Sequence, residues 1–332
     1  IDGDWVRAKG TTLGADNGMG VAAIMAILES KTIAHPALEA LFTTDEETGM
    51  TGAQKLSNDA LKGEILLNLD TELDTEIEIG CAGGIDVSAY ADYKEEVTPS
   101  EVVAYHIVVN GLLGGHSGME IHLGRGNANK LMNRVLFHQY EKHGLRLAQL
   151  HGGGLRNAIP RESEAVVVVP KKNQAAFEKD FKENAEHIFK ELQPVEPHLS
   201  ITFKETQAPA KVMEAGAQVA FLRAVAAAPC GVYAMSRSVE GLVEASNNIA
   251  NVKVEVGKIA VLCMSRSSVE SSKKDLSESL AAAFELAGYK VEFTGAYPGW
   301  EPNPHSPILQ VLKETYVRLF QEEPNVAAIH AG

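Results

Sequence analysis

The first 80 residues alternate short apolar runs with turn residues. A glycine-rich turn at residues 14–18 precedes apolar positions spaced three and four apart through residues 21–28, which predicts a helix. Apolar runs at residues 38–43 and 65–69 predict short strands, the second of them buried on both faces, and a short helix is expected at residues 52–56. Strands that alternate with helices are typical of an α/β fold in which helices cover a parallel sheet.

The pattern changes after residue 83. Period-two alternation through residues 102–108 predicts a half-exposed antiparallel strand. Further helices are expected at residues 127–140, 175–192, 269–287 and 307–320, and further strands at residues 165–169, 258–264, 290–293 and 326–329. Up to about residue 296 this mixture of elements predicts an α+β module.

We therefore predict two domains, one inserted into the other. Residues 1–83 and 297–332 are expected to form an α/β domain whose parallel or mixed sheet is sandwiched by helices. Residues 84–296 are expected to form the inserted α+β domain, and a turn at residues 297–302 marks the return to the first domain. The length of 332 residues also favours two domains, because single hydrophobic cores rarely grow to that size.

Composition excludes several classes of protein. The chain is 45% hydrophobic and 22% charged, which argues against bulk disorder, and its net charge of −14 argues against a nucleic-acid partner. No apolar run reaches the roughly 18 to 20 residues that span a bilayer. Three cysteines lie far apart at Cys81, Cys230 and Cys263, as expected for reduced thiols in the cytoplasm.

Acidic residues are concentrated in the first quarter of the chain. Residues 1–80 hold 15 Asp and Glu against five Lys and Arg. Asp16, the acids at residues 45–47, Asp70 and His330 each follow an expected strand or lie in the turn beyond one, and such ends converge on one crevice in an open parallel sheet. A divalent cation would relieve the repulsion among these carboxylates, and an imidazole favours zinc, manganese or cobalt. The surplus of carboxylates suggests two metals that share a bridging acid, about 3.5–4 Å apart.

Each of these residues alone has a simpler interpretation. Asp16 could form an Asx-turn and cap the next helix, and the acids at residues 45–47 could be the first turn of a helix. Asp70 could be a turn residue, and an isolated His330 is more often a core or surface histidine than a ligand. Their expected convergence on one crevice favours the metal site.

Several sequence words in order resemble a known family. These words lie at residues 11–18 (TTLGADNG), 43–49 (TTDEETG), 67–70 (LNLD), 81–86 (CAGGID), 114–118 (GGHSG), 155–162 (LRNAIPRE), 296–300 (AYPGW) and 329–332 (IHAG). They resemble the co-catalytic zinc metallopeptidases that include the carnosinases and aminoacylases. The resemblance covers nearly the whole chain and is weakest between about residues 171 and 250.

The resemblance implies a role for each acidic position. Asp16 corresponds to the carboxylate that bridges two zinc ions, Glu47 and His330 to ligands of one ion, and Asp70 to a ligand of the other. Glu46 corresponds to the general base that acts on water. The spacing alone does not distinguish Glu46 from Glu47. Two divalent metals per subunit are expected, zinc in the first place, with cobalt or manganese as alternatives.

The inserted domain resembles the family's lid and dimerisation domain. His116 corresponds to a histidine that reaches across a homodimer to polarise the scissile carbonyl bound by the partner subunit, and Asn157 and Arg266 to groups that hold the substrate's terminal carboxylate. Without the resemblance, His116 would be interpreted as a loop histidine, Asn157 as a turn residue and Arg266 as one partner of a surface ion pair.

The sequence departs from the family at both ends. The family's first metal ligand is a histidine upstream of the bridging aspartate, and residues 1–15 contain no histidine. The family also continues beyond the histidine that corresponds to His330. We therefore expect a partial chain of a larger enzyme, and we expect this polypeptide to bind the second metal weakly and to hydrolyse little.

The resemblance predicts a metal-dependent dipeptidase that acts on small dipeptides, with Xaa-His dipeptides as the expected substrates. It predicts a homodimer formed through the inserted domain, with no nucleic-acid or membrane partner. Two alternatives stay open: an aminoacylase-type amidohydrolase on the same fold, and a non-catalytic dimerisation or binding module. A nucleotide-binding domain is disfavoured because residues 14–20 do not form G-x-G-x-x-G and an aspartate in the turn would repel phosphate.

Overall fold

A computed structural model describes the chain from residue 1 to residue 332 except residues 2, 12, 47–49 and 72. The chain forms two compact units. Unit 1 comprises residues 1–77 and 305–326, and unit 2 comprises residues 78–304 and 327–332. The domain boundaries expected from the sequence stay a prediction, and the last six residues, which include His330, belong to unit 2.

Three helices of unit 1 lie wholly within the described residues. They are α1 (Gly18–Glu29), α3 (Thr51–Gln54) and α8 (Pro307–Phe320). Asn17 caps α1, because its side-chain oxygen accepts the Gly20 backbone N–H at 2.8 Å. Proline at the first position starts α8, and Gln321 in a left-handed conformation ends it. The sequence patterns at residues 21–28, 52–56 and 307–320 therefore predicted helices that are confirmed, although α3 has only four residues.

The two early strands expected from the sequence are wrong. Residues 38–43 and 65–69 have no strand structure, and the side chains of Ile65, Leu66 and Leu67 are 64%, 74% and 53% exposed. A strand buried on both faces needs hydrogen-bonded neighbours on both edges, and these segments have no strand partner among the described residues. No parallel sheet forms in the described part of unit 1.

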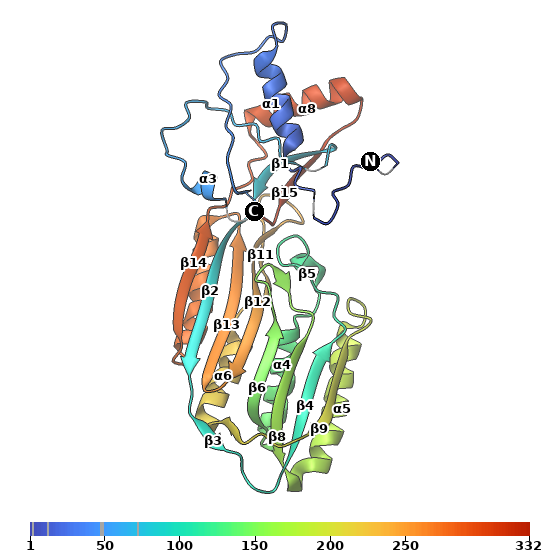
Figure 1. The fold of residues 1–332 in the computed structure, drawn as a ribbon, viewed down its shortest axis with the longest axis vertical. Coiled ribbons are helices and arrows are strands. Elements are labelled where there is room, and N and C mark those ends of the chain that lie inside the picture. The colour runs from blue at the N-terminus through green and yellow to red at the C-terminus, as the bar shows by residue number, and fades with distance from the viewer. Residues whose placement is uncertain (2, 12, 47–49, 72) are drawn as a thin grey trace. The chain divides into compact units, whose positions relative to one another are not determined.

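Unit 2 is built on a nine-stranded sheet (Figure 1). Its strands are β2 (Gly83–Asp92), β4 (Val102–Asn110), β6 (Arg146–Gly153), β8 (Ser163–Pro170), β9 (Ser200–Thr206), β11 (Gly231–Met235), β12 (Val243–Glu255), β13 (Lys258–Ser267) and β14 (Lys290–Tyr297). The order across the sheet is β14–β2–β13–β12–β6–β8–β4–β9, and β11 pairs with β12. The neighbouring strands of this sheet run antiparallel.

Short strands form three further pairs. These are β3 (Glu95–Val97) with β10 (Lys211–Met213), β5 (Gly115–His116) with β7 (Ala158–Ile159), and β1 (Glu76–Cys81) with β15 (Asn325–Ile329). The chain therefore has a mixed α/β fold whose main sheet is antiparallel.

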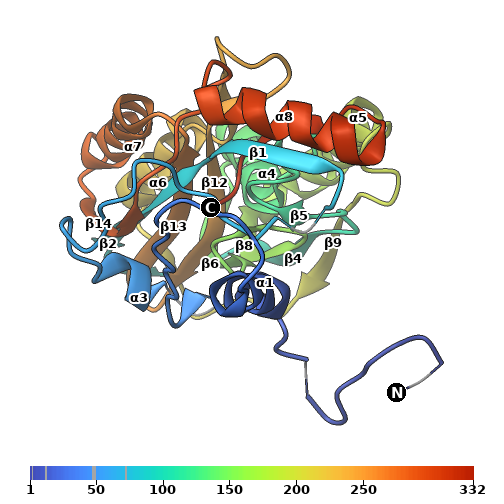
Figure 2. The same cartoon turned by 90° about the horizontal axis from the view of Figure 1, so that it is seen from above.

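Four helices cover one face of the main sheet (Figures 1 and 2). They are α4 (Ala128–His143), α5 (Gln174–Leu192), α6 (Ala215–Ala227) and α7 (Glu270–Glu285). Single-turn helices η1 (Ile121–Leu123) and η2 (Lys171–Asn173) precede α4 and α5. Tyr105 and Ile107 alternate along β4 on the covered face and pack with Phe177 and Phe181 of α5 in one buried cluster. The strand expected at residues 102–108 and the helices expected in this region are confirmed.

Two further features concern the helices and the cysteines of the described residues. None of the helices in these parts of the chain combines the length and the apolar character that a membrane crossing requires. Cys81, Cys230 and Cys263 are free thiols, and burial raises the pKa of each.

Candidate active site

One row of residues crosses four neighbouring strands at one end of the main sheet. Arg266 on β13 lies opposite Ser246 on β12 and Gly84 on β2, and Gly84 lies opposite Tyr297 on β14. Residues that face each other on adjacent strands project from the same face of a sheet. Because Gly84 has no side chain, Arg266 and Tyr297 meet across it, and Arg266 Nη1 donates to Tyr297 Oη at 2.9 Å. A Cβ atom on Gly84 would lie only 2.6–2.7 Å from the Tyr297 ring.

Arg266 is a buried cation in this row. Arg266 is 3% exposed, and its Nε atom is buried without a hydrogen-bond partner among the described residues. No carboxylate among the described residues forms an ion pair with Arg266; the nearby Asp86 pairs with Arg156 at 3.2 Å instead. The interpretation of Arg266 as one partner of a surface ion pair is therefore wrong. A buried guanidinium that makes no direct ion pair with the described residues is suited to a ligand carboxylate, which it can bind at two points.

His330 reaches the same row through Ser246. Its Nε2 atom lies 2.7 Å from Ser246 Oγ, and the residue is 6% exposed. The Ala82 backbone N–H holds the segment by donating to the carbonyls of Ile329 and Ala331 at 3.1 and 3.0 Å. Burial, and then the charge of Arg266, lower the pKa of His330 to about 3, so the imidazole is neutral near pH 7.

His116 lies in a glycine-rich loop with a defined ring orientation. Its Nδ1 atom accepts the backbone N–H groups of Gly118 and Met119 at 3.3 and 3.1 Å. In the neutral ring the proton is therefore on Nε2, which leaves an N–H free to donate. Burial and the charge of Arg266 lower the pKa of His116, which favours this neutral form.

An ion pair supports the His116 loop from below. The backbone N–H of His116 donates to Glu120 Oε2 at 2.8 Å. Arg125 Nη1 donates to Glu120 Oε1 at 2.8 Å and to the Gly114 carbonyl at 2.5 Å. Gly114 and Gly115 have φ values of +66° and +137°, a backbone conformation that other residues rarely adopt. The loop needs these two glycines in order to present His116.

The His116 loop packs against the backbone of His330. A Cβ atom on Gly118 would lie 2.2 Å from the His330 carbonyl oxygen and 3.2 Å from His116 Cε1. Glycine at position 118 therefore permits this approach. Both histidines belong to unit 2 of one chain.

Asn157 is held beside the same loop. Its carbonyl accepts the Ser117 backbone N–H at 2.8 Å. Asn248 of β12 fixes the flanking residues by donating to the carbonyls of Arg156 and Ala158 at 3.1 and 2.8 Å. The Asn157 side chain is exposed. Unit 2 thus gathers four of the residues predicted from the sequence, His116, Asn157, Arg266 and His330.

The predicted carboxylates lie in unit 1. Asn17 Nδ2 donates to the Leu69 carbonyl at 2.6 Å, and this bond joins the turn of Asp16 to the segment of Asp70. Asp16 and Asp70 are both exposed. This bond brings two of the expected ligands into the same part of unit 1.

Glu46 is also exposed. Glu47, predicted as a metal ligand, lies outside the described residues.

A metal site can be tested against these donors. In the part of the chain that the structure describes, no three His, Cys, Asp or Glu side chains are grouped so that they could hold a metal ion. The donor chemistry nevertheless fits a divalent cation. In the tautomer whose Nε2 donates to Ser246, the buried His330 Nδ1 carries the lone pair, and it makes no hydrogen bond with the described residues. A histidine whose second nitrogen is oriented by a hydrogen bond is the usual form of a metal ligand.

Sequence reasoning missed the residues that orient this site. Ser246, Asn248 and Glu120 matched no motif, because their roles follow from strand register and loop contacts. Gly84 and Tyr297 lie inside the words at residues 81–86 and 296–300, but the words alone assigned them no role. The occurrence of Gly84 and Tyr297 in these two segments was the one signal in the sequence that pointed to them.

Comparison with known proteins agrees with this picture. A family model described as a peptidase dimerisation domain (M20_dimer) matches residues 107–196, which include His116, Asn157, α4 and α5. The chain is 40% identical to the cytosol non-specific dipeptidase of Escherichia coli (strain K12), over 100% of this chain and 68% of that protein. It is also similar to the crystal structure of aminoacylhistidine dipeptidase from Vibrio alginolyticus, with 44% identity, a TM-score of 0.95, and coverage of 100% of this chain and 68% of that one.

Proposed function

The chain belongs to the family of the cytosol non-specific dipeptidases, and on that premise we propose that it is a metal-dependent dipeptidase that hydrolyses small dipeptides, Xaa-His dipeptides among them. The alignment with this relative covers all 332 residues and therefore every position assigned to the site. The observation that carries the proposal is the buried Arg266, which has no carboxylate partner among the described residues and lies in one row with the His330 contact.

Divalent metal ions form the first part of the proposal. Asp16, Glu47, Asp70 and His330 would hold two of them, with Asp16 shared, and zinc is the metal that this mixture of carboxylates and imidazole suits best. When bound, these ions supply positive charge that polarises a peptide carbonyl and makes water a stronger nucleophile near neutral pH. The orientation of His330 by Ser246 supports its assignment as a ligand.

Proton transfer is assigned to Glu46. Its carboxylate takes a proton from the attacking water and passes it to the amine that leaves when the peptide bond breaks. His116 donates its Nε2–H to the oxygen that becomes negative during the attack. The hydrogen bonds from Gly118 and Met119 to Nδ1 support this role, because they keep the proton on Nε2.

Substrate binding is assigned to Arg266 and Asn157. Arg266 pairs with the terminal carboxylate of the dipeptide, and Asn157 contributes a polar contact from the neighbouring loop. An enzyme that binds this carboxylate acts on the bond next to a free C-terminus, since a residue added after it would place a peptide group at that point. This contact gives the exopeptidase character of the proposal.

A homodimer completes the proposed enzyme. The match of residues 107–196 to a peptidase dimerisation domain supports assembly of two copies through this region. Within one chain the His116 loop already lies against His330, and the role of His116 across the dimer stays a prediction from the resemblance. The free cysteines and the name of the Escherichia coli relative support a cytoplasmic location.

Steady-state hydrolysis separates the proposal from its alternatives. The full-length protein loaded with zinc is expected to hydrolyse alanyl-histidine and to leave N-acetyl-histidine intact. Removal of the metal with a chelator is expected to abolish the activity, and added zinc to restore it. Hydrolysis of N-acetyl-histidine alone would indicate an aminoacylase, and turnover of neither compound would indicate a binding module.

A further inference from the structure

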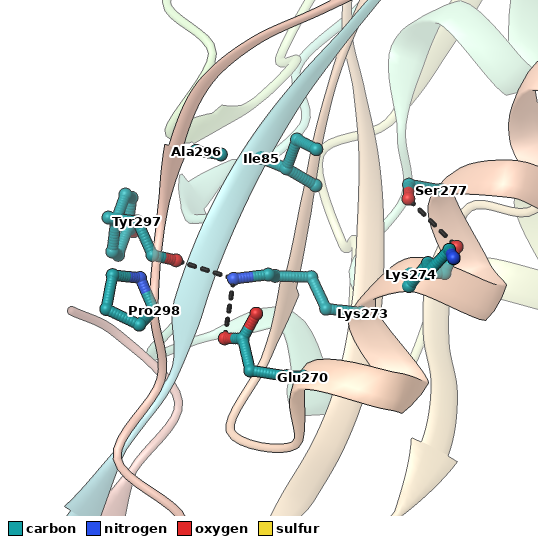
Figure 3. Close-up of a pocket in the computed structure, with 8 residues that line it drawn as sticks. All are labelled: Ile85, Glu270, Lys273, Lys274, Ser277, Ala296, Tyr297 and Pro298. Atoms are coloured by element: carbon teal, nitrogen blue, oxygen red, sulfur yellow. Dashed lines mark hydrogen bonds and ion pairs between the residues drawn. The ribbon is translucent and has the colours of Figure 1, made fainter.

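A buried lysine lies behind the substrate-binding row. Lys273 of α7 is 6% exposed, and its Nζ atom donates to the Tyr297 carbonyl at 2.6 Å and pairs with Glu270 Oε1 at 2.7 Å. Figure 3 shows both contacts in a pocket of about 370 Å³ between α7 and β14. Neither Lys273 nor Glu270 has a role in the proposed reaction.

Glu270 extends this contact to the next turn of the chain. Its Oε1 atom also accepts the Gly299 backbone N–H at 2.9 Å. Burial opposes ionisation of Glu270, yet the hydrogen bonds from Lys273 and Gly299 lower its pKa. Lys273 and Glu270 therefore hold the backbone on both sides of Pro298, at the Tyr297 carbonyl and at the Gly299 N–H.

Glycines let this segment lie directly on β2. A Cβ atom on Gly83 would lie 2.4 Å from the Gly299 nitrogen and 2.6 Å from the Tyr297 carbonyl oxygen. Cys81 and Trp300 exchange backbone hydrogen bonds of 2.9 Å in both directions. The two segments at residues 81–86 and 296–300 therefore pack against each other.

Tyr297 connects the helical face of the sheet with its opposite face. Ile85 lines the pocket together with Lys273. Successive residues of a strand face opposite sides of the sheet, so the neighbouring Gly84 lies on the opposite face. The Tyr297 carbonyl faces Lys273, while its phenol reaches over Gly84 to Arg266. A shift of the Tyr297 backbone would therefore displace the one hydrogen bond that the Arg266 guanidinium makes with the described residues.

We propose that Lys273 and Glu270 are positioning residues that fix Tyr297, so that its phenol orients Arg266 for the terminal carboxylate of the substrate. The inference rests on the proposed function, in which Arg266 binds that carboxylate. If the inference holds, the preference of the protein for a ligand with a free C-terminal carboxylate over a ligand with a blocked one depends on Lys273 and Glu270, which do not touch the substrate.

Binding of two matched ligands tests the inference without hydrolysis. The first is an alanyl-histidine analogue in which a CH2–NH group replaces the peptide bond, and the second is the same analogue with a C-terminal carboxamide. Calorimetry with the zinc-loaded protein gives the ratio of their Kd values. In Lys273→Met this ratio is expected to fall about tenfold, the size of one hydrogen bond to a charged group, while the carboxamide binds as before.

Three further variants make the result specific. Tyr297→Phe removes one oxygen atom and is expected to lower the ratio in the same way, which keeps the test decisive if Lys273→Met does not fold. Lys130 is a second partly buried lysine, which donates to the carbonyls of Val225, Ala226 and Ala228. Lys130→Met is expected to lose stability and keep the ratio. Lys274→Met, at the exposed neighbour, is expected to change neither.

Four outcomes decide the matter. A wild-type protein that binds both ligands equally would overturn the inference, as would a wild-type ratio in both Lys273→Met and Tyr297→Phe. Equal weakening of both ligands in these variants would also overturn it, since Lys273 would then be structural only. A ratio that falls in a protein that does not hydrolyse alanyl-histidine would support the inference and reject the proposed function.

Discussion

Unit 1 and unit 2 hold their polar groups in different ways. In unit 2, hydrogen bonds orient His116, Arg266 and His330, and the row that carries Arg266 and Ser246, the partner of His330, crosses four strands of one antiparallel sheet. In unit 1, Asp16 and Asp70 are exposed, and the bond from Asn17 to the Leu69 carbonyl joins their two segments. Unit 2 is thus preorganised by its own contacts. Under the proposal, metal ions would relieve the mutual repulsion of the carboxylates of unit 1.

Large apolar side chains are also more deeply buried in unit 2 than in unit 1. Phe177 and Phe181 of unit 2 are 0% and 1% exposed; Phe177 packs at a tilt against Tyr105, and Phe181 packs edge-to-face against Phe203. Leu66 of unit 1 is 74% exposed. In unit 2 the antiparallel strands and the helices bury one another's apolar side chains. In unit 1 an apolar run without strand partners among the described residues stays exposed.

The largest expected effect concerns proton transfer in unit 1. Glu46→Gln is expected to lower kcat by about 10³-fold with little change in bound metal, because the amide cannot take a proton from water. Stopped assays with alanyl-histidine and metal analysis of the same samples check this. Glu64→Gln, at another exposed carboxylate of unit 1, is the matched control and should keep the wild-type kcat. Unchanged turnover in Glu46→Gln would remove the proposed base.

Core substitutions test the contrast in burial. Phe177→Ala is expected to lower the free energy of unfolding of unit 2 by about 3–5 kcal/mol, since it leaves a cavity among close-packed rings. Leu66→Ala removes an exposed side chain and is expected to cost about 0.5 kcal/mol or less. Urea denaturation followed by circular dichroism gives both values. Equal losses in the two variants would mean that Leu66 is buried in solution.

A smaller effect is expected from the oxyanion donor of unit 2. His116→Ala should lower kcat by about 10²-fold and leave KM nearly unchanged, because the donor acts on charge that develops during the reaction. His122→Ala, an exposed histidine of the neighbouring η1 turn, is the control. A rise in KM with unchanged kcat would instead assign His116 to ground-state binding.

The pH dependence of stability is expected to be the smallest effect. The folded pKa of His330 is about 3, below the 6.5 of an exposed histidine, so the unfolded chain takes up the proton as the pH falls through 6.5. In the metal-free protein, His330 alone should lower the free energy of unfolding by about 2 kcal/mol between pH 7.5 and pH 5. His116, whose pKa is also lowered, adds to this loss. His330→Gln should remove the larger part; an identical pH profile in this variant would contradict the burial of His330.

The sequence predicted those elements whose periodicity is local. The helix expected at residues 307–320 and the strand at residues 102–108 have patterns that depend on neighbouring residues alone, and both are confirmed. The run at residues 65–69 looked like a buried strand, but an apolar run contains no information about its strand partners. β12 was not predicted, because Ser246, Asn247 and Asn248 interrupt its apolar pattern.

The site was predictable in its residues and not in its geometry. Motif resemblance singled out Arg266 and His330. Their meeting at Ser246 depends on the register between β12 and β13 and on a contact across 84 positions, which no local pattern encodes. The contact of Tyr297 with Arg266 likewise depends on a glycine in the strand between them. Resemblance can name such residues, and only strand pairing brings them together.

The central claim is that carboxylates of unit 1 and the imidazole of His330 bind common divalent ions. Anomalous diffraction at the zinc edge, from crystals of the zinc-loaded full-length protein, tests it directly. The account predicts two zinc peaks bridged by Asp16, with Asp70 on one ion and His330 on the other. Zinc peaks that lie away from Asp16 and His330, or no ordered zinc at all, would contradict the account.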